Sequence, residues 1–371
     1  MCTSVWFAVN AIMPQLTEAY VIPPDSVSFF TSVIQFGFIV GTLVFAFFGT
    51  ADRYHPSKLF MYCAFISTIS NLALLIPYNT FYSISLFRFI TGFCLAGIYP
   101  IGIKIAADYF VHALGKVLGV LVGTLVLGTA IPHFFNYISL DNSLLVVIGA
   151  TSALSLFGGV LVGLAIPKGD YNKSSPEFEP KKFLDIFSSA GFKKASFGYF
   201  GHMWELYTFW AFVPIFISLY NQINTTNLNV SLWSFIIIGV GFLSCVIGGN
   251  LATTYSSQWV AKYSLLGSFI CCLLFPLSLE MPQSLFLTIM IIWGLLVISD
   301  SPQLSTLVAQ SAPPAFKGTA ITIVNCIGFS ITIISIQLLG YLSRYYHTPY
   351  IYLLLAIGPL LGFIYLNKKK K

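Results

Sequence analysis

A carboxylate, Glu205, and an imidazole, His202, stand near the middle of an apolar run that extends from residue 195 to 220. The run is long enough to cross a bilayer, since about 20 helical residues span the hydrocarbon core. A charge at that depth costs about 2.5 kcal/mol or more, so it normally faces a cavity or a partner. The two side chains are three residues apart and share one helical face. The spacing predicts a polar pair in a water-accessible cavity, where Glu205 binds a proton or cation, or meets a basic substrate group, and His202 tunes or relays the proton.

A second carboxylate, Asp300, lies about two thirds of the way along a later apolar run, two residues before Pro302. Proline removes a backbone hydrogen bond, so we expect the helix to open locally beside this acid. That arrangement predicts a gate or a cation ligand. The alternative is structural: Asp300 bonds the freed amides, while Glu205 is paired or neutral in the core and His202 is a hydrogen-bonded packing residue.

Two cations lie in one earlier apolar run, Arg88 deep within it and Lys104 near its end. We expect Arg88 to take part in a substrate site or gate. Lys104 either does the same or extends its amine to the interface. Tyr99, next to Pro100, is expected to reach the cavity. Two cations with small polar groups suit a small solute, including an anionic one, and indoles could stack on an organic ligand; the residues concerned are Asn10, Gln35, Asn71, Asn325, Trp6, Trp204 and Trp210.

The composition shows which elements hold these side chains. Of the 371 residues, 57% are hydrophobic and 8% are charged, against about 25% charged in soluble proteins. The chain is therefore a polytopic membrane protein, and in lipid its apolar segments must be helices. We count twelve, at residues 1–20, 27–50, 58–78, 82–107, 116–138, 143–166, 195–220, 231–254, 261–279, 284–309, 318–342 and 349–366.

Basic residues alternate between the loops and predict the orientation. Positive residues mark cytoplasmic loops. One set of loops holds Arg53, Lys58, Lys116, Lys262, Lys317, the lysines between 168 and 194, and the Lys368–Lys371 tail, whereas the other set holds Arg344. This asymmetry places the C-terminus in the cytoplasm, and an even number of helices places the N-terminus there too. We expect a multi-pass protein of the plasma membrane, most simply a bacterial inner membrane.

The polar stretch between residues 167 and 194 divides the chain into two halves of six segments. We therefore expect an N-terminal bundle over 1–166, a cytoplasmic linker over 167–194 and a C-terminal bundle over 195–371. Prolines, glycines and lysines recur between the halves at an offset of 200 to 202 residues, as in Pro14 and Pro214 or Pro100 and Pro302. Such a repeat is typical of transporters built from two related bundles. Only about 13 residues precede Pro14, so the first helix is expected to be short or its start incomplete.

The residues from Gly49 to Lys58, GTADRYHPSK, resemble the signature G-x-x-x-D-R-x-G-R-K of the major facilitator superfamily. Asp52 and Arg53 match in place, whereas the first glycine is one residue late, the second is His55, and one basic residue, Lys58, replaces the pair. Arg88-x-x-x-Gly92 followed by Gly97 is similar to a second motif of the family, again with its last glycine one position late. The resemblance implies a carrier that works by rocking of two six-helix bundles, with Asp52 and Arg53 in a charge relay that stabilises one gate state.

We predict a secondary active transporter that takes up a small solute by alternating access, with proton coupling as a symporter. The segment over 116–138 lacks the G-P-x-x-G-G signature of the family's drug–proton antiporters, which favours uptake over efflux, although efflux of a drug or metabolite stays an alternative. A receptor without transport is a further alternative.

An enzyme is not expected, because no cluster of His, Asp or Cys and no large loop domain is present. The seven cysteines lie in apolar runs without metal-ligand spacing, so no metal or other cofactor is expected. The expected partners are the solute and the lipid bilayer, with no nucleic acid, and the protein is expected to be a monomer.

Overall fold

The computed structural model describes residues 1–23, 26–110, 114–139, 142–167, 183–313 and 317–368. These residues form α-helices and short 3₁₀ helices, with no strand among them. Eleven helical spans in the described residues are long and apolar enough to cross a membrane. The first apolar segment supplies the remaining position of the predicted twelve, as a series of short helices.

The N-terminal half contains the first six apolar segments, and its helices follow the predicted runs to within a few residues, apart from one short helix in the loop after the second run. The helices are η1 (Cys2–Val5), α1 (Ala8–Ala11), α2 (Met13–Tyr20), α3 (Val27–Phe47), α4 (Thr50–Arg53), α5 (Pro56–Leu72), η3 (Ala73–Leu75), α6 (Phe81–Leu95), α7 (Tyr99–Tyr109), α8 (Leu114–Ile138) and α9 (Ser143–Ala165).

The C-terminal half repeats this plan after a short helix, α10 (Phe183–Ile186). Its helices are α11 (Ala190–Asn224), α12 (Val230–Gly239), α13 (Gly241–Tyr255), α14 (Ser257–Ser278), α15 (Gln283–Ser299), α16 (Ser301–Ser311), α17 (Lys317–Tyr345), η6 (Pro349–Ala356) and α18 (Ile357–Asn367). The domain limits drawn from the sequence at residues 166 and 195 stay a prediction, because most of the linker lies outside the described residues.

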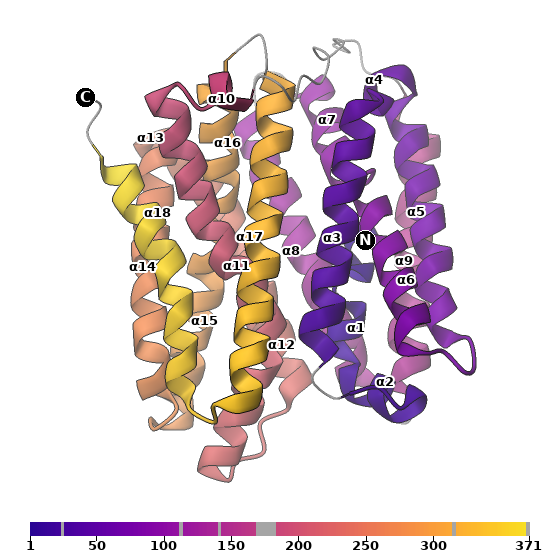
Figure 1. Ribbon diagram of the computed structural model, residues 1–371, viewed down its shortest axis with the longest axis vertical. Helices are drawn as coiled ribbons and strands as arrows, with labels where there is room; N and C mark the ends of the chain where they lie inside the picture. The colour runs from indigo at the N-terminus through magenta and orange to yellow at the C-terminus, as the bar shows by residue number, and fades with distance from the viewer. Residues whose placement is uncertain (24–25, 111–113, 140–141, 168–182, 314–316, 369–371) are drawn as a thin grey trace.

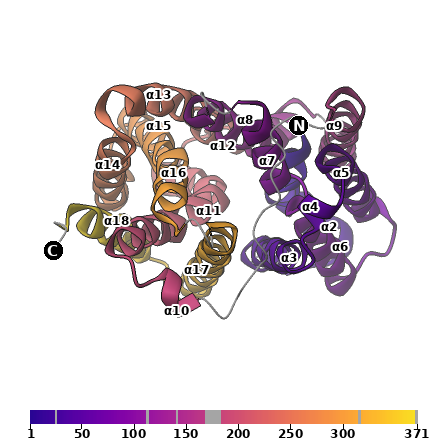
Figure 2. The same cartoon turned by 90° about the horizontal axis from the view of Figure 1, so that it is seen from above.

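Seen from above, the helices up to α9 gather on one side and those from α11 onward on the other (Figure 2). The two groups meet along two lines of contact: α3 packs on α17, and α8 packs on α12 and α13. The helices α4, α7 and α10 lie at the same end of the molecule as the C-terminus (Figure 1). We call this the basic end, because Arg53 of α4 lies there and the Lys194 amine bonds the Lys368 carbonyl 3.1 Å away.

Side-chain amides join the two halves near the opposite end. The Gln337 amide of α17 donates to the Ser28 carbonyl at 3.0 Å and the Ser32 hydroxyl at 2.8 Å, both on α3. The Asn136 amide of α8 donates to the Ser231 hydroxyl of α12 at 2.8 Å. We call these five residues the polar clasp. They hold the halves together at the end away from the basic residues.

Two helices are interrupted at matching positions of the repeat. The fourth span breaks between α6 and α7, just before Pro100, and the tenth breaks at Asp300, between α15 and α16 and just before Pro302. The local opening predicted beside Pro302 is therefore present. The first span is the most irregular, because Trp6, Phe7 and Ile12 lie between its short helices. In a membrane the carbonyls released at such breaks need other partners.

Candidate functional site

Glu205 lies on α11 inside the C-terminal half and is 1% exposed. Its Oε1 atom accepts hydrogen bonds from the Ser268 hydroxyl at 2.5 Å, the Trp293 indole at 2.6 Å and the Cys272 thiol at 3.2 Å. Ser268 and Cys272 are on α14 and Trp293 is on α15. A carboxylate removed from water needs such donors, because an unpaired buried charge is expensive. Three neighbouring side chains thus replace the water that Glu205 lost.

His202 and Asp300 form a second buried pair in the same half. The His202 Nδ1 atom lies 2.8 Å from the Asp300 Oδ1 atom, and the two residues are 1% and 2% exposed. Asp300 occupies the break between α15 and α16, so the pair joins α11 to an interrupted helix. The other imidazole nitrogen, Nε2, has no hydrogen-bond partner among the described residues. The pair therefore combines a proton carrier with a carboxylate at a helix break.

The sequence placed Glu205 and His202 together in a water-accessible cavity, and the structure arranges them differently. Each has its own partners: Glu205 bonds α14 and α15, and His202 meets Asp300. All three are buried in this conformation, so water does not reach them here. The reason is that α11 presents this face to the interior of its own bundle. Their role in proton coupling stays a prediction.

Arg88 is 1% exposed on α6 and bonds the backbone of the first span. Its Nη1 atom donates to the Val5 carbonyl at 2.9 Å, and its Nη2 atom donates to the Trp6 carbonyl. These carbonyls belong to the last residue of η1 and the first residue of the irregular stretch that follows it. Arg88 therefore supplies hydrogen bonds that the broken helix cannot supply itself. Its predicted role toward substrate stays a prediction.

The other predicted cavity residues are scattered. The Asn10 amide donates to the Thr31 hydroxyl at 2.8 Å within the N-terminal half. The Trp204 indole donates to the Leu354 carbonyl at 2.9 Å, which fastens α11 to η6 and not to a cavity. Lys104 and Tyr99 are both on α7, and Lys104 is partly exposed. The structure does not gather these four around Glu205.

Of the predicted gating pair, Arg53 is exposed on α4 at the basic end. The side chain of Asp52 lies outside the described part of the chain. The charge relay that the resemblance implied between these residues therefore stays a prediction.

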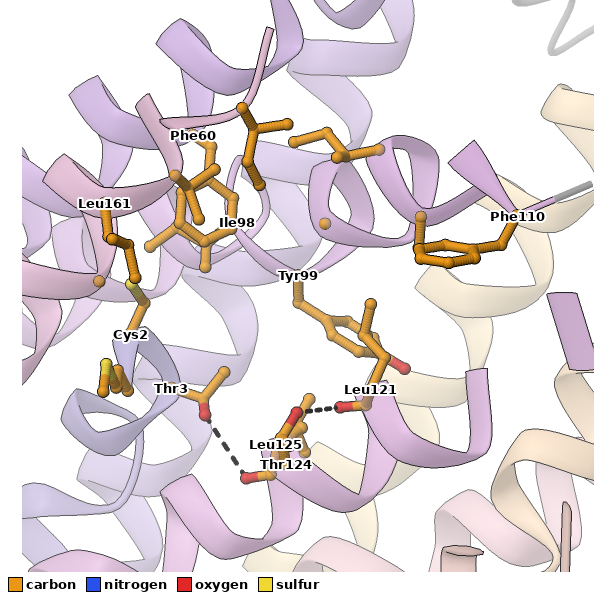
Figure 3. A pocket seen from close by; sticks show the side chains of 17 residues that line it. Cys2, Thr3, Phe60, Ile98, Tyr99, Phe110, Leu121, Thr124, Leu125 and Leu161 are labelled. Atoms are coloured by element: carbon orange, nitrogen blue, oxygen red, sulfur yellow. Dashed lines mark hydrogen bonds between the residues drawn. The ribbon is translucent and has the colours of Figure 1, made fainter. Parts of the chain in front are cut away.

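Tyr99 lines an apolar cavity of about 420 Å³ in the N-terminal half (Figure 3). The cavity lies among η1, α5, α7, α8 and α9, where Cys2, Phe60 and Leu161 also line it. Its two threonine hydroxyls bond backbone, since Thr3 donates to the Leu125 carbonyl at 3.4 Å and Thr124 donates to the Leu121 carbonyl at 2.8 Å. Glu205, His202 and Asp300 do not line this cavity.

Six aromatic rings meet where the two halves join, and the sequence did not predict this cluster. We call it the aromatic seam: Trp6, Phe7 and Phe38 from the N-terminal half, with Tyr207, Trp210 and Phe329 from the C-terminal half. The Trp6 ring centroid lies 5.5 Å from that of Tyr207 and 5.9 Å from that of Phe329, both stacked. Phe38 and Phe329 are 4.4 Å apart, and Phe7 and Trp210 are 5.9 Å apart edge to face. Trp6 and Trp210 were noted as stacking residues, but pairing across halves about 200 residues apart is not visible in one sequence.

All six seam rings are buried in this conformation. The seam and the acidic groups share α11, which presents Tyr207 and Trp210 to the other half and Glu205 to its own bundle. Movement of α11 would therefore affect both places. No three His, Cys, Asp or Glu side chains in the described ranges are grouped to hold a metal ion.

The sequence of this chain matches a known protein family. Residues 1–336 match the family model described as Major Facilitator Superfamily. A search of curated proteins finds no match.

Two of the solved structures that resemble this chain cover nearly all of it. The human organic anion transporter MFSD10 (TETRAN) has a TM-score of 0.73 at 15% identity, covering 99% of this chain and 97% of that one. The proton:xylose symporter XylE bound to 6-bromo-6-deoxy-D-glucose has a TM-score of 0.70 at 13% identity, covering 98% and 92%. At these identities the likeness shows the fold alone. It confirms the predicted all-α membrane fold of two six-helix bundles.

Proposed function

The chain belongs to the major facilitator superfamily of transporters, and from this premise we propose that it takes up a small solute by alternating access, driven by a proton gradient. The two halves would rock about their lines of contact and expose the seam first to one side and then to the other. The observation that carries the proton-coupled part is the burial of three ionisable side chains: Glu205 and His202 on α11, and Asp300, which meets His202.

Burial supports coupling because it restricts when a proton can move. A proton on Glu205 or Asp300 cancels a charge inside the bundle, and its free energy depends on the surrounding donors. A ligand shifts a conformational equilibrium only by its different affinity for the two states. If rocking of the bundles rearranges α14 and α15 around Glu205, the proton affinity changes with the state. The proton gradient then drives the cycle.

α11 is the physical link between solute and proton. Tyr207 and Trp210 meet the other half, and Glu205, two residues before Tyr207, bonds Ser268 and Trp293. A solute that parts the seam rings would shift this helix. Glu205 would then lose or gain donors without touching the solute.

Replacement of Glu205 by Gln tests this proposal in vesicles that hold the purified protein. Gln keeps the size and one oxygen acceptor but cannot release a proton. We expect uphill uptake under an imposed pH gradient to fall to the background level, while counterflow of labelled against unlabelled solute continues. Glu280→Gln is the matched control, since Glu280 is exposed at the surface. Normal accumulation by the Glu205→Gln protein would contradict the proposed coupling site.

The same vesicles separate the alternatives. An efflux antiporter would expel solute against protons under the gradient that drives uptake here. A receptor would bind solute without flux in either direction.

The proposed setting is a bacterial inner membrane, with both termini and the basic end in the cytoplasm and one copy as the working unit. It is supported by Arg53, Lys194 and Lys368 at one end of the molecule, because positive residues mark the cytoplasmic side. Labelling of a cysteine introduced at Lys368, in right-side-out against inverted vesicles, checks the orientation.

A further inference from the structure

The aromatic seam carries polar atoms that nothing in the described structure satisfies. The indole nitrogens of Trp6 and Trp210 are buried and have no hydrogen-bond partner. Buried polar groups normally have partners, so each exception needs an explanation. Here two exceptions fall within one ring cluster at the meeting of the halves.

Gln35 adds a third unsatisfied side chain. It is 0% exposed, and neither its amide nitrogen nor its oxygen has a partner among the described residues. On α3 it lies one turn from Ser32, which accepts from Gln337 of the other half, and one turn from Phe38 of the seam. Residues at this spacing share a helical face. Gln35 therefore belongs to the face that meets α17, between the polar clasp and the aromatic seam.

Arg88 brings a positive charge to the backbone of Trp6, a residue of the seam. Its two described bonds go to the carbonyls of Val5 and Trp6, so the guanidinium lies directly behind the Trp6 residue of the seam. No carboxylate among the described residues pairs with it, and its Nε atom has no partner. The buried acids of the other half are engaged elsewhere, Glu205 with three donors and Asp300 with His202. A buried charge without a counter-charge is costly, and an anion would relieve that cost.

The unsatisfied atoms are mostly donors. The two indole N–H groups, the Gln35 amide nitrogen and the Arg88 Nε–H can donate, while the Gln35 oxygen is the acceptor among them. Six rings could also form a cage for a cation, since aromatic faces attract positive charge. The uncompensated Arg88 charge opposes this, because a second cation nearby would be repelled. The donors and the positive charge favour an anionic oxygen ligand. The aromatic rings of the seam favour a ligand with a flat apolar part.

We propose that the solute is a small organic anion with a planar unsaturated or aromatic body, of the aryl carboxylate class. Its carboxylate is received by Arg88, Gln35 and the Trp6 indole, and its flat part lies between the seam rings. In this conformation the rings stack on one another and fill the space that the solute takes when they part. This inference rests on the proposed transport function and names the chemistry of its substrate.

Binding of three benzene derivatives to the purified protein tests the inference without any change to the chain. Benzoate is the anion, benzamide is the neutral molecule of the same shape, and benzylamine is the cation. We expect benzoate to bind, measured by calorimetry or by quenching of indole fluorescence, and the other two to bind at least about 30-fold more weakly. Acetate carries the charge without the ring, and we expect it to bind more weakly than benzoate because it cannot stack.

Variants locate the site. Arg88→Gln should lower benzoate affinity at least about 30-fold and reduce the difference between benzoate and benzamide. Gln35→Leu leaves the positive charge of Arg88 in place and should lower benzoate affinity several-fold. Lys116→Gln, which removes an exposed lysine of α8, is the matched control and should bind benzoate normally.

Equal affinity for benzoate and benzamide in the unaltered protein would overturn the inference, and so would a folded Arg88→Gln protein with normal benzoate binding. If Arg88→Gln does not fold, the comparison of the three ligands and the Gln35→Leu protein still decide. Benzoate binding without uphill transport would contradict proton coupling but leave the substrate class intact. Uphill transport of another solute by a protein that does not bind benzoate would contradict the substrate class but leave proton coupling intact.

Discussion

The two halves of the molecule share a repeat, but Arg88 in one half and Glu205 in the other are stabilised in opposite ways. In the N-terminal half the first span is broken, and Arg88 from a neighbouring helix bonds its backbone carbonyls. In the C-terminal half the corresponding span, α11, is one continuous helix of 35 residues that carries the acid itself. At the repeat offset of 200, Glu205 stands where the first half has Val5.

Because of this difference, a change of charge disturbs the backbone in the N-terminal half but not in the C-terminal half. Glu205 takes its hydrogen bonds from side chains, so its charge can change while the backbone of α11 stays paired. Arg88 bonds backbone carbonyls, so its removal disturbs the first span itself. The C-terminal half is therefore suited to gain and lose a proton, and the N-terminal half to hold a fixed positive charge.

The largest expected effect on stability comes from replacing Arg88. Arg88→Leu leaves two buried carbonyls without donors, and we expect the free energy of unfolding to fall by about 3 kcal/mol, because each unsatisfied group costs about 1–3 kcal/mol. Glu205→Gln keeps an acceptor for its donors and should change stability by less than about 1 kcal/mol. Unfolding titrations in detergent compare the two. Equal effects would show that the halves do not differ in this way.

A second prediction concerns a close contact between two helices that both halves have in common. Gly92 of α6 and Gly294 of α15 are 202 residues apart, and at each a β-carbon would collide with a backbone carbonyl of a packed helix, that of Ile34 and of Ile237 respectively. We expect Gly92→Ala and Gly294→Ala each to lower stability by about 2 kcal/mol, because the helices must move apart. The same unfolding titration measures both.

Gly149→Ala is the control for this pair, since a β-carbon there meets no heavy atom within 4 Å. It should leave stability unchanged or slightly raised. A loss confined to one of the two glycine variants would show that the close helix contact is not equivalent in the halves.

The smallest expected effect concerns the line where the halves meet. Gln337→Leu removes two hydrogen bonds of the polar clasp, each worth about 1 kcal/mol. We expect the free energy of unfolding to fall by at most about 2 kcal/mol in total, and the equilibrium to shift toward the conformation open at that end. Thiol labelling of a cysteine introduced at Ser28, which is 5% exposed, should become faster. Unchanged labelling would mean that the clasp does not hold the halves closed.

Much of the fold could be predicted because the bilayer limits the choices. Eleven of the twelve apolar runs became helical spans whose ends lie within a few residues of the predicted ones, and the break beside Pro302 appeared where proline removes a backbone bond. The first span was harder, because its breaks at Trp6 and Phe7 carry no proline or glycine signal.

The candidate site was predicted only in part. Glu205, His202 and Asp300 were identified because charges are rare in such runs, but the partners of Glu205 were not. Ser268, Cys272 and Trp293 are 63 to 88 residues away and look like ordinary core residues. Helical spacing placed His202 and Glu205 on one face, yet a small rotation of α11 relative to its neighbours decides which partner each one meets.

From the sequence alone came the helical spans, their arrangement as two six-helix bundles and the presence of Glu205, His202, Asp300 and Arg88 within them, because hydrocarbon forces every buried backbone group into a helix and makes every charge conspicuous. Only the tertiary structure decided what each charge touches. Contacts such as Arg88 with Trp6, Glu205 with Trp293 or Trp6 with Tyr207 depend on how rigid helices rotate and pack against one another. That packing is settled by the shapes of many side chains at once, and no single stretch of sequence contains it.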